Sequence, residues 1–271
     1  MPNDNLKNYL HLHFIVFIWG FTAILGALIT MDALPLVWYR MLLAVGFVGL
    51  YVLIKRFSLS APKNALFGFT VAGLVIAVHW IAFFQAIKVS NVSVTLATMS
   101  TGSFFAAILE PFWYKRKIIW YEILFGVLVI AGLGIIFKVE AKYVDGILLA
   151  LFSAFLSAVF SLINGKYTHY YRPSVISFYE LLSGVGFITL YLAFTGGFSA
   201  SFFKVTLNDW MYLLLLASIC TGYAFIASVK VMRFISPYTV MLTINLEPVY
   251  GILLAFFILG DAEKMSPQFY L

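Results

Sequence analysis

Glu247 is a carboxylate near the middle of a long apolar run, residues 236–259. An ionised group is costly in such surroundings, so it normally faces a cavity or a partner. Pro248 follows it and frees a backbone carbonyl. Thr239 and Thr243 precede it at helical spacing and would share its face. The pattern predicts a polar surface on which Glu247 binds an ammonium group or a proton. The alternative is a structural carboxyl, hydrogen-bonded between helices.

Three more ionisable residues, Arg40, His79 and Glu180, also lie within apolar runs. His79 is followed by Trp80, and a histidine can exchange a proton near physiological pH. The sequence leaves open whether His79 is a proton site, a hydrogen-bond donor to a ligand or a packing residue. We expect structural roles for Arg40 and Glu180. Each would reach a membrane surface or tie its own half of the chain together, and the two would not pair directly.

Aromatic and hydroxyl side chains could line a cavity around these groups. Trp19, Trp80 and Tyr223 lie deep in their runs and could form a wall for an apolar or aromatic ligand, although packing against lipid explains each of them as well. Thr98 and Thr101 belong to a run of small and hydroxyl residues that suits either a polar wall or close helix packing. The predicted binding set is Glu247, His79, Trp80, Trp19, Thr98, Thr101, Thr243 and Tyr223.

Several motifs that would indicate an enzyme are absent from the sequence. It contains no phosphate-binding Walker loop, no zinc-protease His-Glu-x-x-His, no serine nucleophile elbow and no cysteine metal motif. The single cysteine, Cys220, lies in an apolar run and is interpreted as a small buried residue. We therefore expect no enzymatic activity, no cofactor and no metal.

Nine apolar stretches must position these residues, each close to the roughly 20 residues that a helix needs to cross a bilayer. They cover residues 11–30, 35–54, 65–87, 91–113, 118–137, 145–164, 174–194, 209–229 and 236–259. Only 10% of the residues are charged, against about 25% in soluble domains, so most of the surface must face lipid. The runs are too long and too uniform for barrel strands. The sequence predicts an all-α, polytopic membrane protein.

The distribution of basic residues predicts the orientation. Of the 17 Lys and Arg residues, eleven fall on the side of the N-terminus, five on the other side, and Arg40 within a helix. The positive-inside rule then places the N-terminus in the cytoplasm and the protein in the cell's inner (plasma) membrane. The first run is too long for a signal-peptide core and lacks a convincing cleavage site, so we expect it to be retained.

An internal repeat is the most informative feature. Residues 37–53 and 177–193 share seven of 17 positions at an offset of 140. Further on, residues 83–89 align with 225–231, and Thr101-Gly102 with Glu247-Pro248. Five helices per repeat is an odd number, so the second copy would enter the membrane inverted. We predict repeats over 1–142 and 143–271. The second lacks its fifth helix, which would begin near Ser266, so nine of ten helices are present.

The order of these motifs resembles the EamA family of the drug/metabolite transporter superfamily. The residues that carry the resemblance are Phe17-Ile18-Trp19-Gly20-Phe21, Pro35, Tyr39-Arg40, Ala86-Ile87, Leu246-Glu247-Pro248-Val249-Tyr250-Gly251 and Leu259-Gly260-Asp261. There are two departures besides the missing helix. Ser157-Ala158 stands where the first repeat has Trp-Gly, and Gly260-Asp261 stands where the family usually has Gly-Glu.

The resemblance implies ten helices around a central cavity, alternating access, and export of amino acids or related metabolites. One alternative is an importer or exchanger of another metabolite, such as a vitamin, a sugar or a nucleotide-linked compound. A less favoured alternative is a non-transporting scaffold or an intramembrane enzyme. The expected partners are a small-molecule substrate, protons as the candidate coupling ion, and the lipid bilayer. We expect no nucleic acid, and a monomer.

Overall fold

The computed structural model describes residues 2–263, 265 and 269, and within them the chain is helical, with no strand. The helices are α1 Pro2–Leu28, α2 Ala33–Ile54, α3 Lys63–Val89, α4 Val92–Met99, α5 Gly102–Tyr114, α6 Trp120–Val139, η1 Ala141–Tyr143, α7 Val144–Tyr167, α8 Pro173–Thr195, α9 Leu207–Leu215, η2 Leu216–Tyr223, α10 Ala224–Val231, α11 Pro237–Ile244, α12 Glu247–Leu259 and η3 Gly260–Glu263.

Eight helices or joined helix pairs in this described part are long and apolar enough to cross a membrane. The ninth predicted stretch, 118–137, forms α6, whose apolar part is shorter, Trp120–Ile135. The predicted all-α membrane architecture is thereby confirmed. The helix expected to begin near Ser266 falls outside the described residues.

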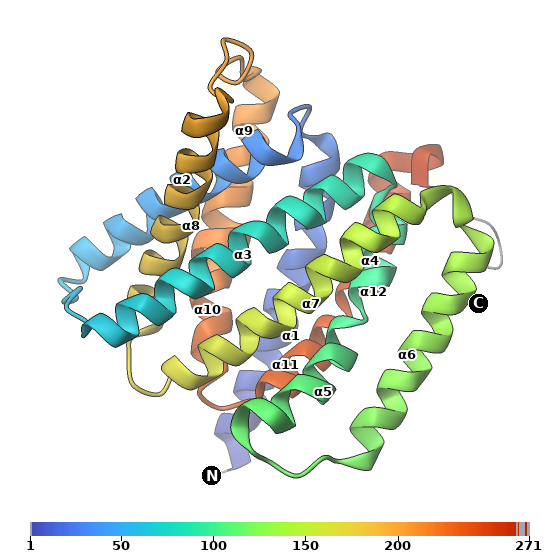
Figure 1. The fold of residues 1–271 in the computed structure, drawn as a ribbon, viewed down its shortest axis with the longest axis horizontal. Helices are drawn as coiled ribbons and strands as arrows, with labels where there is room; N and C mark the ends of the chain where they lie inside the picture. The colour runs from blue at the N-terminus through green and yellow to red at the C-terminus, as the bar shows by residue number, and fades with distance from the viewer. Residues whose placement is uncertain (1, 264, 266–268, 270–271) are drawn as a thin grey trace.

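The helices pack in a pattern that repeats between the two halves of the chain. α3 runs alongside α7 and crosses α8, and α2 packs against α8 (Figure 1). α1 packs against α12, while its counterpart α7 packs against α4 and α5. α6 lies at the edge of the bundle beside α5 (Figure 1). Exchanging equivalent helices reproduces the same contacts, as expected for two repeats related by a pseudo-two-fold axis.

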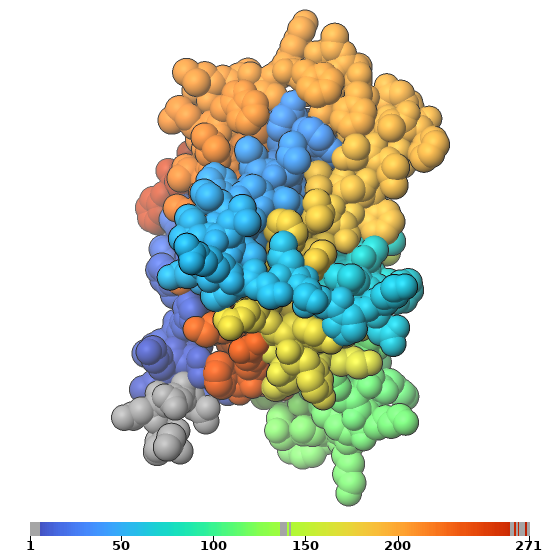
Figure 2. Space-filling model, turned by 90° about the vertical axis from the view of Figure 1, so that its left-hand side faces the viewer, coloured from blue at the N-terminus to red at the C-terminus, as the bar shows by residue number. Residues whose placement is uncertain are grey.

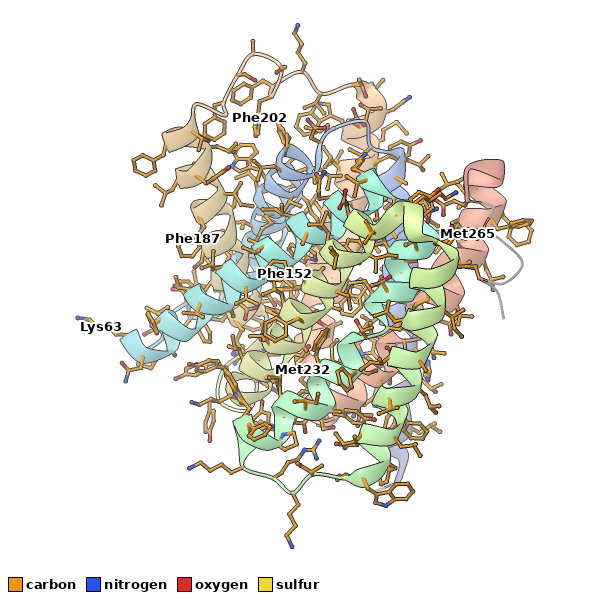
Figure 3. The ribbon with its side chains drawn as sticks, turned by 45° about the vertical axis from the view of Figure 1, so that its right-hand side comes forward. Lys63, Phe152, Phe187, Phe202, Met232 and Met265 are labelled. Atoms are coloured by element: carbon orange, nitrogen blue, oxygen red, sulfur yellow. The ribbon has the colours of Figure 1, made fainter. Side chains whose placement is uncertain are left out.

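The two ends of the bundle are formed by different connections. The segment that follows α8 covers one end, and the connection from α5 to α6 lies at the opposite end (Figure 2). Phe202 and Met232 lie toward these two ends (Figure 3). The N-terminus lies at the same end as the α5–α6 connection (Figure 1).

Two of the membrane-crossing helices are broken at equivalent positions. α4 ends at Met99 before α5 begins at Gly102, and α11 ends at Ile244 before α12 begins at Glu247. At both breaks, backbone N–H groups donate hydrogen bonds to carbonyls three residues earlier instead of four. One example is Thr101 N–H to the Thr98 carbonyl at 3.1 Å. Pro248 explains the second break, because it has no N–H to donate to the preceding turn.

Hydroxyl groups accompany the first break and connect it to the second. Thr101 Oγ1 donates to the Thr98 carbonyl at 2.8 Å, and Ser103 Oγ donates to the Ser100 carbonyl at 3.1 Å. Such bonds compete with the regular helical pattern. Asn245 Nδ2 donates to Ser103 Oγ at 2.9 Å, which joins the two breaks directly. The stretch predicted over 236–259 is therefore present as two joined helices, α11 and α12, with the break beside Pro248.

The segment η2 is a third irregularity, because its residues are wound as a π-helix. Thr221 Oγ1 donates to the carbonyl of Leu216, five residues earlier, at 2.8 Å. A π turn accommodates an extra residue and therefore rotates the side chains that follow it.

Candidate functional site

A cavity of about 80 Å³ lies at the centre of the bundle, between helices of both repeats. Its walls are largely aromatic and apolar, with a few polar groups, as is usual for ligand sites. The lining residues are Trp19 and Thr22 from α1, Arg40 from α2, Ile76, His79, Trp80 and Phe83 from α3, Met99 from α4, Ser157, Phe160 and Ser161 from α7, Phe225 and Ser228 from α10, Met232, Ile244 and Glu247.

Glu247 is the first residue of α12 and lines this cavity with 9% of its surface exposed. The break in the helix brings it there, because the N-terminus of α12 begins inside the bundle rather than at a membrane surface. Among the described residues, no hydrogen bond or ion pair joins its carboxylate. The positive end of the α12 dipole favours a negative charge at this position.

Arg40 is 1% exposed and also lines the cavity. Its Nε donates to Thr221 Oγ1 at 2.7 Å, and its Cζ lies 3.9 Å from the ring centroid of Trp80. Its Nη1 is buried without a hydrogen-bond partner in the described part of the chain. A guanidinium in this setting has an unused donor for an anionic or carbonyl group.

The expectation that Arg40 serves only its own half or reaches a membrane surface is therefore wrong. Arg40 and Trp80 belong to the first repeat, whereas Thr221 belongs to the second. The π turn at Thr221 and the indole of Trp80 together provide a polar and an aromatic surface for the guanidinium deep in the bundle. No ion pair joins Arg40 and Glu247 in the described structure.

His79 is held by Ser153 of α7. Its Nδ1 lies 2.9 Å from the Ser153 carbonyl oxygen and 2.8 Å from Ser153 Oγ, which itself donates to the His79 carbonyl at 3.0 Å. A carbonyl oxygen can only accept, so the geometry assigns the proton to Nδ1 and leaves Nε2 as an acceptor. His79 therefore combines a packing hydrogen bond with a place in the cavity wall.

Trp19 and Trp80 also belong to the predicted binding set, and both line the cavity. The indole Nε1 of Trp19 donates to the Cys220 carbonyl at 3.2 Å, within the π turn. Trp80 packs against Phe225, with ring centroids 5.5 Å apart. The structure thus brings Glu247, His79, Trp80 and Trp19 together.

The other four predicted residues lie outside the cavity lining. Thr98 and Thr101 are buried at the first helix break, and Thr243 donates to the Thr239 carbonyl at 2.8 Å. Tyr223 is 44% exposed and pairs with His11 at 2.9 Å.

Sequence reasoning missed several polar residues of the cavity, notably Thr22, Ser157, Ser161 and Ser228. Ser157 and Ser161 are spaced by one helical turn, as are Ser153 and Ser157 before them, which was a usable signal. Thr22 and Ser228 are isolated small hydroxyl residues, and such residues are common in packed membrane helices.

Comparison with known proteins agrees with this architecture. The model of the EamA-like transporter family matches residues 7–138 and 144–269, one match for each repeat. This chain belongs to the EamA-like transporter family. The family is part of the drug/metabolite transporter superfamily.

Two further comparisons describe how this EamA-like chain relates to other proteins. A solved structure described only as "Crystal structure of protein" superposes with a TM-score of 0.74 at 16% identity, over 98% of this chain and 93% of that chain. At this identity the likeness shows a shared fold. No protein with a curated function matches the chain.

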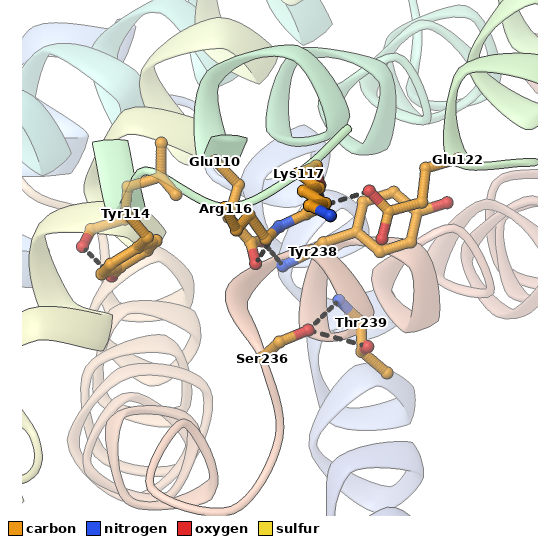
Figure 4. Close-up of polar contacts among 9 residues, drawn as sticks. Glu110, Tyr114, Arg116, Lys117, Glu122, Ser236, Tyr238 and Thr239 are labelled. Atoms are coloured by element: carbon orange, nitrogen blue, oxygen red, sulfur yellow. Dashed lines mark hydrogen bonds and ion pairs between the residues drawn. The ribbon is translucent and has the colours of Figure 1, made fainter. Parts of the chain in front are cut away.

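In this EamA-like chain, a polar network ties helices together at the end that holds the N-terminus (Figure 4). Glu110 accepts from Arg116 Nε at 3.1 Å and from the backbone N–H of Tyr238 at 2.7 Å. Arg116 Nη2 pairs with Glu122 at 2.5 Å. Burial lowers the pKa of Arg116, but the hydrogen bonds and charges of Glu122 and Glu110 outweigh it, so the pKa is raised overall.

At the opposite end, the start of α9 is tied to the end of α1. Asp209 accepts from the N–H and the hydroxyl of Thr30, both at 2.7 Å, and Thr206 Oγ1 caps α9 by accepting from Asp209 N–H. Lys88 donates to the Ile29 carbonyl. Each end of the bundle therefore has its own set of hydrogen bonds that join neighbouring helices.

Proposed function

We propose that this protein is a secondary transporter, a permease that exports amino acids or related small metabolites by alternating access through the central cavity. One observation carries the proposal. Arg40 and Glu247, from opposite repeats, line one aromatic cavity without pairing with each other. An amino acid has one carboxylate and one ammonium group, and it offers a partner to each of these residues.

The cavity must change shape during transport. Its volume of about 80 Å³ is well below the 300–1,000 Å³ of typical ligand pockets. A metabolite can enter only after the helices at one end separate. The two repeats supply the moving parts, and the hydrogen-bonded networks at the two ends must break alternately.

We further propose that the protein spans the cell's inner membrane as a monomer, with its N-terminus in the cytoplasm. The excess of Lys and Arg on the side of the N-terminus supports this orientation. Export then corresponds to loading from the end that holds Glu110 and Arg116.

The test is uptake of labelled amino acids, aromatic ones included, into liposomes that contain the purified chain. Wild type should transport at least one member of the panel, and Glu247→Gln should lose most of this transport because it removes the counter-charge for the ammonium group. Asp145→Asn, an exposed carboxylate on α7, is the matched control and should transport normally. Normal transport with unchanged pH dependence in Glu247→Gln would contradict the assigned role.

A second candidate is an importer or exchanger of an anionic metabolite, and the unpartnered Nη1 of Arg40 favours it. A guanidinium can bind phosphate groups as well as carboxylates, in both cases through paired N–H donors. Folded wild-type protein that transports anionic metabolites, but no amino acid, would select this candidate.

A further inference from the structure

Glu180 is a second buried carboxyl group, and the cavity does not use it. It lies on α8 with 1% of its surface exposed. Asn164 Nδ2 donates to its Oε1 at 2.8 Å, and its Oε2 has no partner among the described residues. An ionised carboxylate without a cation is very costly at such a site, so the group must carry a proton or a bound cation.

The surroundings of Glu180 contain further unused acceptors. Ser177 lies one turn before it on the same face of α8. The side chains of Ser177 and Asn164 are both fully buried, and Ser177 Oγ and Asn164 Oδ1 have no partner in the described part of the chain. Asn164 Oδ1 and an ionised Glu180 can only accept, so a proton on the Glu180 carboxyl group supplies an O–H donor to this region, as the Ser177 hydroxyl does.

Glycines seal this site from lipid. An added Cβ on Gly73 of α3 would collide with the Glu180 backbone carbonyl and lie 2.9 Å from Ser183 Cβ. Gly184 lies one turn after Glu180 on α8. A Cβ added to Gly184 would lie 2.8 Å from the Gly73 carbonyl oxygen. α3 and α8 therefore pack backbone to backbone beside Glu180, and water can reach the carboxyl group only if these helices move.

The titratable groups on neighbouring helices are engaged elsewhere. Arg40 of α2 is bound to Thr221, and His79 of α3 is bound to Ser153. Lys88 of α3 donates to the Ile29 carbonyl.

The tyrosines near α8 have other contacts as well. Tyr179 of α8 donates to the Leu59 carbonyl at 2.8 Å, and Tyr39 of α2 stacks on Phe202. Tyr167 of α7 packs against Phe69. The remaining titratable side chains of α2, α3, α7, α8 and α10 are exposed: Tyr51, Lys55, Lys63, Asp145, Lys166, Tyr191 and Lys230.

Glu180 is also linked to the wall of the central cavity. Asn164 Nδ2 donates to the Phe160 carbonyl at 3.3 Å as well as to Glu180. Phe160 and Ser161, one turn before Asn164 on α7, line the cavity. A ligand that displaces this turn of α7 alters the hydrogen bond that Glu180 accepts.

We propose that Glu180, together with Asn164 and Ser177, is the binding site of the coupling proton, separate from the substrate site. The proposal rests on the proposed transport function. In the closed protein the carboxyl group holds the proton on Oε2. When α3 and α8 separate, the O–H bond breaks, the proton passes to water on the open side, and the resulting carboxylate is protonated again from the other side.

The experiment separates exchange from accumulation in liposomes. Counterflow of labelled against unlabelled amino acid needs no gradient, whereas accumulation driven by an imposed pH gradient needs the coupling proton. Glu180→Gln keeps the size and the hydrogen bonds of a protonated carboxyl group. It should retain counterflow and lose gradient-driven accumulation.

Ser177→Ala serves as the second variant. In this variant the external pH at which accumulation is half-maximal should shift, because a buried hydroxyl one turn from the Glu180 carboxyl group is removed. If Glu180→Gln does not fold, this shift carries the test, and an unchanged midpoint in Ser177→Ala overturns the proposal.

Other results also contradict the proposal. Accumulation by Glu180→Gln equal to wild type would overturn it, as would loss of counterflow in the folded variant, which would show a structural role. A wild type driven by a sodium gradient instead of a pH gradient would assign the site to a metal cation. Wild-type protein without any counterflow would refute the transport function itself, whereas counterflow without response to a pH gradient would refute only the proton site.

Discussion

The guanidinium of Arg40 lies over the indole of Trp80, with its Cζ 3.9 Å from the ring centroid. The two residues come from neighbouring helices, α2 and α3. A desolvated cation–π contact is worth about 2 kcal/mol. The contact holds the guanidinium in place while leaving its Nη1 without a partner, which is the arrangement expected of a ligand-binding group.

We expect Trp80→Leu to lower the free energy of unfolding by at least about 2 kcal/mol, because it removes this contact and leaves space in a packed core. Trp120→Leu, at a tryptophan that is 73% exposed, should change stability little. Denaturation in detergent, followed by circular dichroism, measures both. Equal effects of the two substitutions would show that the Arg40 contact contributes nothing measurable.

The hydrogen bond between Asn245 and Ser103 should couple the two helix breaks. A double-mutant cycle with Asn245→Ala and Ser103→Ala should give an interaction energy of about 0.6 kcal/mol, with an upper bound near 1.7 kcal/mol. Ser218→Ala is the control, since Ser218 Oγ bonds only within its own segment, to the Leu214 carbonyl. Additive effects of Asn245→Ala and Ser103→Ala would mean that the breaks are independent.

Two glycines of α8 should respond to alanine with opposite signs. In Gly184→Ala the new Cβ meets the Gly73 backbone, so we expect destabilisation of about 1–3 kcal/mol. At Gly186 nothing lies within 4 Å of an added Cβ, so Gly186→Ala should stabilise the helix by about 0.5–1 kcal/mol. Thermal unfolding of the two purified variants decides this. A stabilising Gly184→Ala would contradict the close approach of α3 and α8.

Cysteine labelling tests the orientation. In a Cys220→Ser background, Ser60→Cys precedes α3 and Ser201→Cys follows α8, and both positions are exposed. An impermeant maleimide added to intact cells should label Ser201→Cys and spare Ser60→Cys, and lysis should expose both. The reverse pattern would place the N-terminus outside the cell.

Much of the fold is determined by the sequence alone. Runs of about 20 apolar residues with so little charge have no stable alternative to membrane-crossing helices, because every backbone polar group must be bonded internally. The match between 37–53 and 177–193 indicated two repeats. Glu247 was found for a similar reason, since a carboxylate in the middle of an apolar run needs a cavity or a partner.

The tertiary structure decided which side chains face the cavity. Thr221, the partner of Arg40, lies in the π turn at Leu216–Tyr223, and Glu247 lines the cavity at the break between α11 and α12. Local hydrogen bonds accompany such irregularities, such as that from Thr221 Oγ1 to the Leu216 carbonyl, and they leave no periodic signal in an apolar run. Only the packed helices show that Arg40 crosses to the second repeat, and that Glu180 is sealed beside Gly73 and Gly184.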